Sequence, residues 1–188
     1  MKLYHFTSWY GFRGIAAQRM IRKGKVFTGG HVKPLAVSLT TNPSNRLLGI
    51  PDGRQLEPHI AGALDDISVG IDQKTGIHYC VDHTAFRFAF EIPQDDQNLV
   101  NVADFYAQEP ESLFAMALAA THPFYSLLEA SQQDILAARF LADRCNADRT
   151  DQWWYYLEDL PMSYLVGLDL KTGDDAYEES APIDELVP

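Results

Sequence analysis

The segment from Ala85 to Ile92 has the clearest periodicity in the chain, because apolar side chains occupy every second position. A period of two is typical of a β-strand with one buried face. That face would hold Phe86, Phe88, Phe90 and Ile92. The segment therefore predicts a β-strand in the middle of the sequence.

Three further elements are expected before Asn42. Lys2 to Phe6 is typical of a strand, and Ser8 is a suitable N-cap for a helix that Gly24 would close. The apolar stripe of this helix would consist of Phe12, Ile15, Ala16 and Met20. A second strand, Leu35 to Thr41, is stopped by Asn42 and Pro43. Residues 44 to 75 predict a long loop with short helical pieces.

The later part of the chain predicts first a strand, then helices, then strands again. The expected strands are Ile77 to Val81, Trp153 to Tyr156 and Tyr164 to Leu170. The expected helices are Glu109 to Ala120, Pro123 to Leu128 and one that runs from Ser131 until about Asn146. Since strands and helices do not alternate regularly, the order favours an α+β fold with mixed or antiparallel sheets over a doubly wound parallel sheet.

The length of 188 residues, of which 46% are hydrophobic, fits one globular domain. Such a chain can bury roughly 70% of its unfolded surface. Residues 172 to 188 contain six acidic residues and no basic one, so this tail is expected to be loosely ordered. We therefore predict one domain over residues 1 to 171, followed by an acidic tail.

Charge is distributed unevenly along the chain. The first 51 residues contain eight basic residues and no acidic one, although the whole chain carries a net charge of −11. Such asymmetry is typical of an anion site beside an acidic body, or simply of a solvated basic helix face. The overall acidity argues against non-specific duplex binding and slightly favours a protein partner over a nucleic acid.

Several classes of site and location are disfavoured. Cys80 and Cys145 are too few for a zinc ribbon or a disulfide framework, and the histidines do not show metal-ligand spacing, so no metal is expected. The N-terminal helix carries Arg and Lys, unlike a signal peptide. The apolar run from Leu113 to Ala120 is too short to span a bilayer. We expect a cytoplasmic protein without a membrane association.

Polar side chains occur on both N-terminal strands. His5 and Thr7 lie on the first strand, and a second hydroxyl-rich strand ends with Ser38, Thr40 and Thr41. The first strand should bury apolar residues instead, so this arrangement suggests a binding cleft. A core histidine satisfied by a backbone carbonyl is the alternative interpretation of His5, and Thr is also a good strand former.

Four segments resemble a known superfamily. LYHFTSWYGFRGIAAQRMIRKGKV and AVSLTT are similar to the first two strands of the ADP-ribosyltransferase superfamily. The similarity is to its His-x-Thr branch, which includes DNA-modifying ADP-ribosyltransferase toxins and tRNA 2′-phosphotransferases. FRFAFEIP and WWYYLEDLPMSYLVGLDL resemble the later strands of a related bacterial and phage group. Together these segments cover about half of the chain.

The resemblance implies split β-sheets with helices packed around a cleft for NAD, which is a substrate in this superfamily. The enzyme would cleave the bond between nicotinamide and ribose and transfer ADP-ribose to a macromolecule. His5 would then bind the ribose next to the nicotinamide, with Thr7 beside it. An imidazole suits this role because it can donate from one nitrogen and accept at the other.

Further NAD contacts follow from the same resemblance. Ser38, Thr40 and Thr41 would fix the nicotinamide ring or position a carboxylate, and Trp9 or Tyr10 would stack on the adenine or nicotinamide ring. Arg13, with Arg19 and Arg22, would contact the diphosphate. The alternatives are core or rim positions for the aromatic residues and solvated positions for the arginines.

The catalytic carboxylate of the superfamily has no clear counterpart. A late-strand Glu stabilises the oxocarbenium-like ribosyl centre in these enzymes. Gln152 is nearest to that place, and a neutral amide would give little charge stabilisation. Asp151 or Glu158 would substitute if the register differs, and Glu91 is a fourth candidate.

Two other functions stay open. Gln152 favours a non-catalytic binding or inhibitor module, whose acidic surface would occupy a basic protein in a conflict between phage and host. A 2′-phosphotransferase is a third possibility, but it would need more basic residues around the acceptor site than the later chain supplies.

Overall fold

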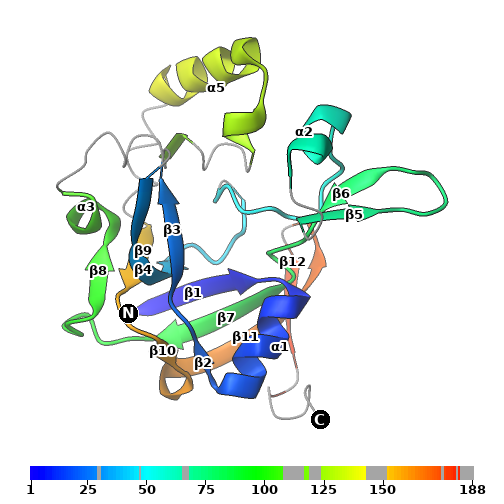
Figure 1. Ribbon diagram of the computed structural model, residues 1–188. Coiled ribbons are helices and arrows are strands. Elements are labelled where there is room, and N and C mark those ends of the chain that lie inside the picture. Colours follow the sequence, from blue (N-terminus) through cyan, green and yellow to red (C-terminus); the bar gives the residue numbers. More distant parts are fainter. Residues whose placement is uncertain are drawn as a thin grey trace.

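The computed structural model describes residues 1–28, 31–46, 48–64, 68–107, 117–118, 124–142, 152–174, 176–180 and 182. Its largest element is an antiparallel sheet with the strand order β12-β11-β7-β1-β4-β9-β8, to which β3 is added through β4 (Figure 1). The strands are β1 (Lys2–Thr7), β3 (Gly24–Thr28), β4 (His31–Thr40), β7 (Phe86–Glu91), β8 (Leu99–Asn101), β9 (Trp153–Tyr156), β11 (Leu165–Gly173) and β12 (Ala176–Glu179). The fold is therefore of the α+β class.

Two small antiparallel pairs and several short helices complete the described part of the fold. The pairs are β2 (Met20–Ile21) with β10 (Leu160–Pro161), and β5 (Val69–Ile71) with β6 (His78–Cys80). The helical elements are α1 (Trp9–Gln18), α2 (Pro58–Ala63), α3 (Val102–Phe105), α5 (Ala130–Ala142), and the 3₁₀ turns η2 (Tyr125–Leu127) and η3 (Met162–Tyr164).

The large sheet consists of two half-sheets that meet at one point. β1 pairs with β7 along its whole length, from Lys2↔Glu91 to Thr7↔Phe86, but with β4 through Tyr4↔Thr40 alone. Figure 1 shows the consequence, since β3 and β4 run across the direction of β1 and β7. We call β12, β11, β7 and β1 the first half-sheet, and β4, β9, β8 and β3 the second.

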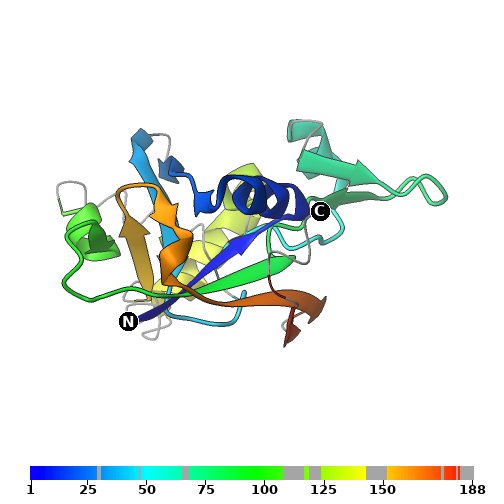
Figure 2. The same cartoon turned by 90° about the horizontal axis from the view of Figure 1, so that it is seen from below.

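Helix α1 covers one face of the first half-sheet (Figure 2). The Phe12 ring stacks on that of Phe86 with centroids 4.3 Å apart, and Leu3, Phe88 and Phe90 are fully buried in the same cluster. The pairs Leu3↔Phe90, His5↔Phe88 and Thr7↔Phe86 place these residues on one side of the sheet. We call this side the α1 face.

The helix and strands predicted before Asn42 are present, but the ends of the helix and of the second strand differ from the prediction. The first helix ends at Gln18 rather than at Gly24, because Arg19 adopts the left-handed conformation with φ of 55° and its N–H bonds to the Ile15 carbonyl. Met20 therefore lies in β2 and not on the helix stripe. The strand predicted over Leu35 to Thr41 begins earlier, at His31, because it forms a hairpin with β3.

Other corrections concern segments that the sequence predicted as loop or tail. The region 44 to 75 contains α2, as predicted, but also strand β5. The alternation predicted for β7 is present, but Ala89 is also buried on the face opposite the phenylalanines, where Arg87 is partly buried and Glu91 is exposed. Part of the acidic tail is ordered, since β12 pairs with β11 from Asp169↔Glu179 to Gly173↔Ala176. The short β8 and α3 had no signal in the sequence.

The helical region agrees with prediction where it is described. The turn η2 lies within the predicted helix Pro123 to Leu128, and α5 begins one residue before Ser131. Residues 117 and 118 are helical, but most of the predicted helix from Glu109 to Ala120 lies outside the described residues, as does Asn146.

Candidate functional site

His5 lies where the two half-sheets meet. The N–H of Thr41 donates to the carbonyl of Gln152 on the β9 side, at 2.9 Å. Because main-chain groups alternate in direction along an antiparallel strand, the Ser38 carbonyl of β4 is directed toward β1. β1 diverges from β4 here, and the Nδ1 atom of His5 bonds to this carbonyl at 3.0 Å. The His5 side chain thus satisfies the Ser38 carbonyl, which has no main-chain donor from β1 at this position.

This contact determines which nitrogen of His5 can bind a ligand. A carbonyl oxygen can only accept, so Nδ1 carries the hydrogen and Nε2 presents a lone pair. Burial lowers the pKa of His5 below its ordinary value, although the bond to Ser38 acts in the opposite direction. The half-buried ring is therefore neutral near pH 7, and within the described part of the chain Nε2 has no partner. Nε2 can accept a hydrogen bond from a hydroxyl group.

Thr7 is on the same face but is directed at α1. It is buried, and a Cβ built on Gly11 would overlap its Oγ1 atom. Ser8 caps the helix as predicted, because its Oγ accepts from the Gly11 N–H at 3.2 Å. Thr7 therefore packs under the first turn of α1, and its role beside His5 stays a prediction.

The aromatic candidates lie at the start of α1. The ring of Trp9 packs on Phe12 and Phe86, with centroids 5.5 and 5.4 Å apart, yet Trp9 is 57% exposed. Phe86 pairs with Thr7, so this partly open ring lies at the Thr7 end of β1, on the α1 face. Tyr10 is 88% exposed, and Arg13 is exposed one turn further along the helix.

The hydroxyl candidates on β4 are divided between the two faces of the sheet. Ser38 and Thr40 share one face, whereas Thr41 follows Leu39 on the other, the face of His5. Thr40 is buried, and its Oγ1 accepts from the Asn42 N–H at 3.0 Å to shape the turn after the strand. Ser38 contributes its carbonyl to His5, and its side chain is exposed on the opposite face.

The carboxylate candidates lie in different places. Gln152 is next to Thr41 and, by strand alternation, on the side of Trp154, which packs against the α1 face. Glu158 lies beyond the other end of β9, is 62% exposed, and forms an ion pair of 2.7 Å with Lys23. Glu91 pairs with Lys2 on the face opposite His5. Asp151 lies outside the described residues.

A polar network that the sequence did not predict joins three distant segments on the opposite face. The Nζ of Lys171 donates to Asp82 Oδ2 and Thr84 Oγ1, both at 2.9 Å, and to the Asp52 carbonyl at 3.0 Å. Asn45 donates to Thr84 Oγ1 at 3.2 Å. These residues are remote in sequence and follow no motif spacing, so no local signal marks them. The network fixes the loop after β4 to β11.

The described residues contain neither a metal-binding cluster nor a membrane-spanning helix. No group of His, Cys, Asp or Glu in them is arranged to hold a metal ion. None of the helices in this part of the chain has the length and apolarity needed to cross a membrane.

Comparison of the chain with protein-family models, curated proteins and solved structures gave no match. The resemblance to ADP-ribosyltransferases therefore stays a prediction from the sequence.

Proposed function

We propose that the chain is an NAD-dependent ADP-ribosyltransferase that binds NAD at the junction of the two half-sheets. The observation that carries this proposal is the neutral imidazole of His5, whose Nε2 accepts while Nδ1 is held by the Ser38 carbonyl. A ribose hydroxyl is a donor of the required kind. The partly open ring of Trp9, near the same face, offers a surface on which a base or nicotinamide stacks.

The transfer step would break the bond between nicotinamide and ribose and place ADP-ribose on a macromolecular acceptor, with protein slightly favoured by the acidic chain. Gln152 is on the His5 side of the sheet and would orient a ribose hydroxyl. It supplies no negative charge to an oxocarbenium-like centre, so the reaction would be slow.

One observation favours a second function, a non-catalytic binding module. The carboxylate of Glu158 is ion-paired with Lys23, and Glu91 is on the face opposite His5. Neither carboxylate is therefore placed to stabilise the positive charge that would develop on a ribose bound at His5. In this case the fold would bind its partner, or NAD, without turnover.

Thermal unfolding in millimolar NAD tests the binding step. A ligand at 100 times its dissociation constant adds about 2.7 kcal/mol of stability, which raises the midpoint clearly. We expect this shift in the wild type, its loss in His5→Ala, and its retention in His59→Ala, which removes a more exposed imidazole on α2. A wild type that NAD does not stabilise would contradict the proposal.

Nicotinamide release separates the two functions. If the chain is a transferase limited by its neutral amide, Gln152→Glu should increase the release of nicotinamide by about tenfold or more, because the new charge stabilises the developing cation. Gln152→Met is the matched control, which should not gain activity. NAD binding without release in the wild type and in Gln152→Glu would favour the binding module.

A further inference from the structure

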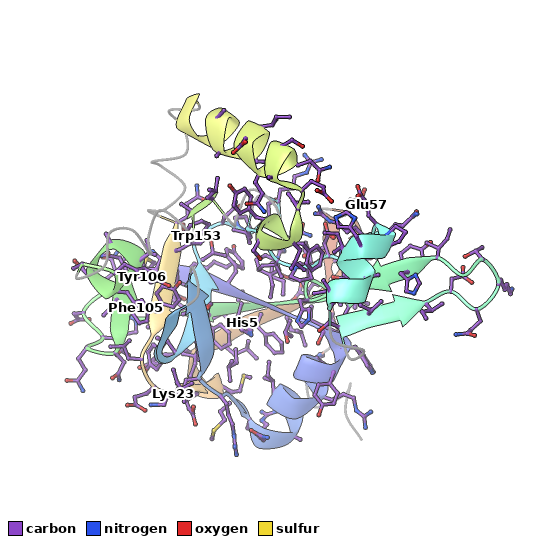
Figure 3. All side chains as sticks on the ribbon, turned by 45° about the horizontal axis from the view of Figure 1, so that its top comes forward. His5, Lys23, Glu57, Phe105, Tyr106 and Trp153 are labelled. Carbon is purple, nitrogen blue, oxygen red and sulfur yellow. The ribbon has the colours of Figure 1, made fainter. Side chains whose placement is uncertain are left out.

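A cavity lies between α2, strand β6 and the turn η2, and His5 is not among its lining residues. Its volume is about 510 Å³, within the range of roughly 300–1,000 Å³ that small-molecule pockets occupy. Figure 3 shows α2, near the label of Glu57, beside the short helical segment that precedes α5. The cavity is therefore formed by parts of the predicted loop 44 to 75, the predicted strand Ile77 to Val81 and the predicted helix Pro123 to Leu128.

The walls of this cavity are mainly apolar. It is lined by Leu64 directly after α2, by Val81 after β6, and by Phe124 and Leu127 around η2. Phe124 belongs to a buried cluster with Leu56, Ile60 and Cys80, and Leu64 and Leu127 pack against that cluster. The apolar wall is thus part of a small buried cluster that is separate from the main core.

The polar groups of the lining are few and uncharged. They belong to Ser68, His83 and Ser126, and none of the described lining residues is Asp, Glu, Lys or Arg. The N–H of His83 bonds to the Pro51 carbonyl at 2.8 Å, while its imidazole has no hydrogen-bond partner among the described residues. Burial lowers the pKa of His83, although the nearby Asp82 carboxylate opposes this. The free imidazole can therefore accept or donate one hydrogen bond.

We propose that this cavity binds an uncharged, largely apolar small molecule that carries a hydrogen-bonding group for His83. None of the described lining residues carries a charge that could balance that of an anionic or cationic ligand. Binding a charged ligand against these apolar walls would therefore cost free energy. The site is independent of the proposed NAD cleft, because no residue named for that cleft lines the cavity.

The probe N-phenyl-1-naphthylamine tests this proposal, because it is neutral, aromatic, carries one N–H group and fluoresces more strongly in apolar surroundings. We expect saturable binding of one probe per chain. Ala63→Trp on α2 and Ser126→Trp on η2 each place a large ring at a lining position of the cavity and should each weaken binding at least tenfold. His83→Ala should weaken binding several-fold, because it removes the hydrogen-bonding group but not the walls.

Ala138→Trp is the matched control, since it makes the same change at an exposed position of another helix, α5, and should leave binding unchanged. The anionic analogue 1-anilinonaphthalene-8-sulfonate should bind at least tenfold more weakly than the neutral probe. Equal binding of both probes, or equal effects of Ala63→Trp and Ala138→Trp, would overturn the proposal. His5→Ala should not alter probe binding, so failure of the NAD proposal would leave this result unaffected.

Discussion

Gly11 and Gly14 are three residues apart on α1 but have different surroundings. A Cβ at Gly11 would overlap Thr7 Oγ1, whereas a Cβ at Gly14 would meet nothing within 4 Å. We predict that Gly11→Ala lowers the free energy of unfolding by about 1–3 kcal/mol, because the first turn of α1 must shift. Gly14→Ala should raise it by about 0.5–1 kcal/mol through helix propensity. Urea unfolding measures both.

The partner of Gly11 can be tested by rescue. In the Gly11→Ala background, Thr7→Ala removes the overlapping hydroxyl, so the double variant should lose less stability than the two single changes together. Strict additivity would show that the contact between Thr7 and Gly11 is not the cause.

The burial of His5 predicts a pH dependence of stability. The pKa of His5 is lowered in the folded state, so the unfolded chain binds more protons as the pH falls through the ordinary value of 6.5. The free energy of unfolding should therefore decrease between about pH 7 and about pH 5. His83, whose pKa is also lowered, contributes in the same direction. His5→Gln should reduce this slope, and adding His83→Gln should reduce it further. An unchanged slope in both variants, measured by urea unfolding, would contradict this account.

Single residues were predictable as candidates but not in their contacts. His5 stood out because a polar ring interrupts an apolar strand. Its bond to the Ser38 carbonyl depends on the divergence of β1 from β4, which no local pattern records. Likewise, the cluster of Ser38, Thr40 and Thr41 looked like one group, but alternation along β4 places Thr41 on the other face.

At the scale of elements, Lys171 connects β11 to two loops. Its side chain is 13% exposed and bonds to Asp82, Thr84 and the Asp52 carbonyl. Loss of one member of a fully buried pair costs roughly 3–5 kcal/mol, and Asp82 is 31% exposed, so Lys171→Met should cost about 2–3 kcal/mol.

Lys23→Met is the matched control for that change. Lys23 pairs with Glu158, whose side chain is 62% exposed, so solvent screens the interaction and its loss should cost less than about 1 kcal/mol. Thermal unfolding compares the two variants. Equal losses of stability would show that the Lys171 network contributes no more than a surface ion pair.

Elements with their own periodicity were predictable, whereas elements defined by a partner were not. The alternation in β7 and the Ser8 cap of α1 are local, and both are confirmed. β12 was predicted as loose tail because its sequence, Ala-Tyr-Glu-Glu, is short and acidic. It is a strand because the edge of β11 is available for pairing and because the Tyr177 hydroxyl bonds to the Thr84 carbonyl at 2.9 Å.

At the scale of the whole molecule, stability should be unequal between the large sheet and the β5–β6 pair. Phe88 and Phe90 of β7 are fully buried in the main core, whereas Ile71 of β5 is largely exposed and its pair projects from the body in Figure 1. We predict that the amides of β7 exchange at least about a hundredfold more slowly than those of β5 and β6. Hydrogen exchange followed by mass spectrometry measures this difference, and equal protection would contradict it.

The fold class followed from the order of elements, but the arrangement of the strands did not. Irregular alternation of strands and helices disfavoured a doubly wound parallel sheet, and the large sheet is antiparallel. The order β12-β11-β7-β1-β4-β9-β8 joins strands from opposite ends of the chain, and such pairings leave no trace in local composition.

The position of β1 has a consequence for synthesis on the ribosome. β1 is made before its long partner β7, which follows more than eighty residues later, as the pair Leu3↔Phe90 shows. At about 5–20 residues per second, β1 waits roughly 4–16 s for that partner, with only one register pair available from β4 in the meantime. The edge of β1 that pairs with β7 is thus open to chaperones until β7 has been made, although α1 can already cover the apolar side of the strand.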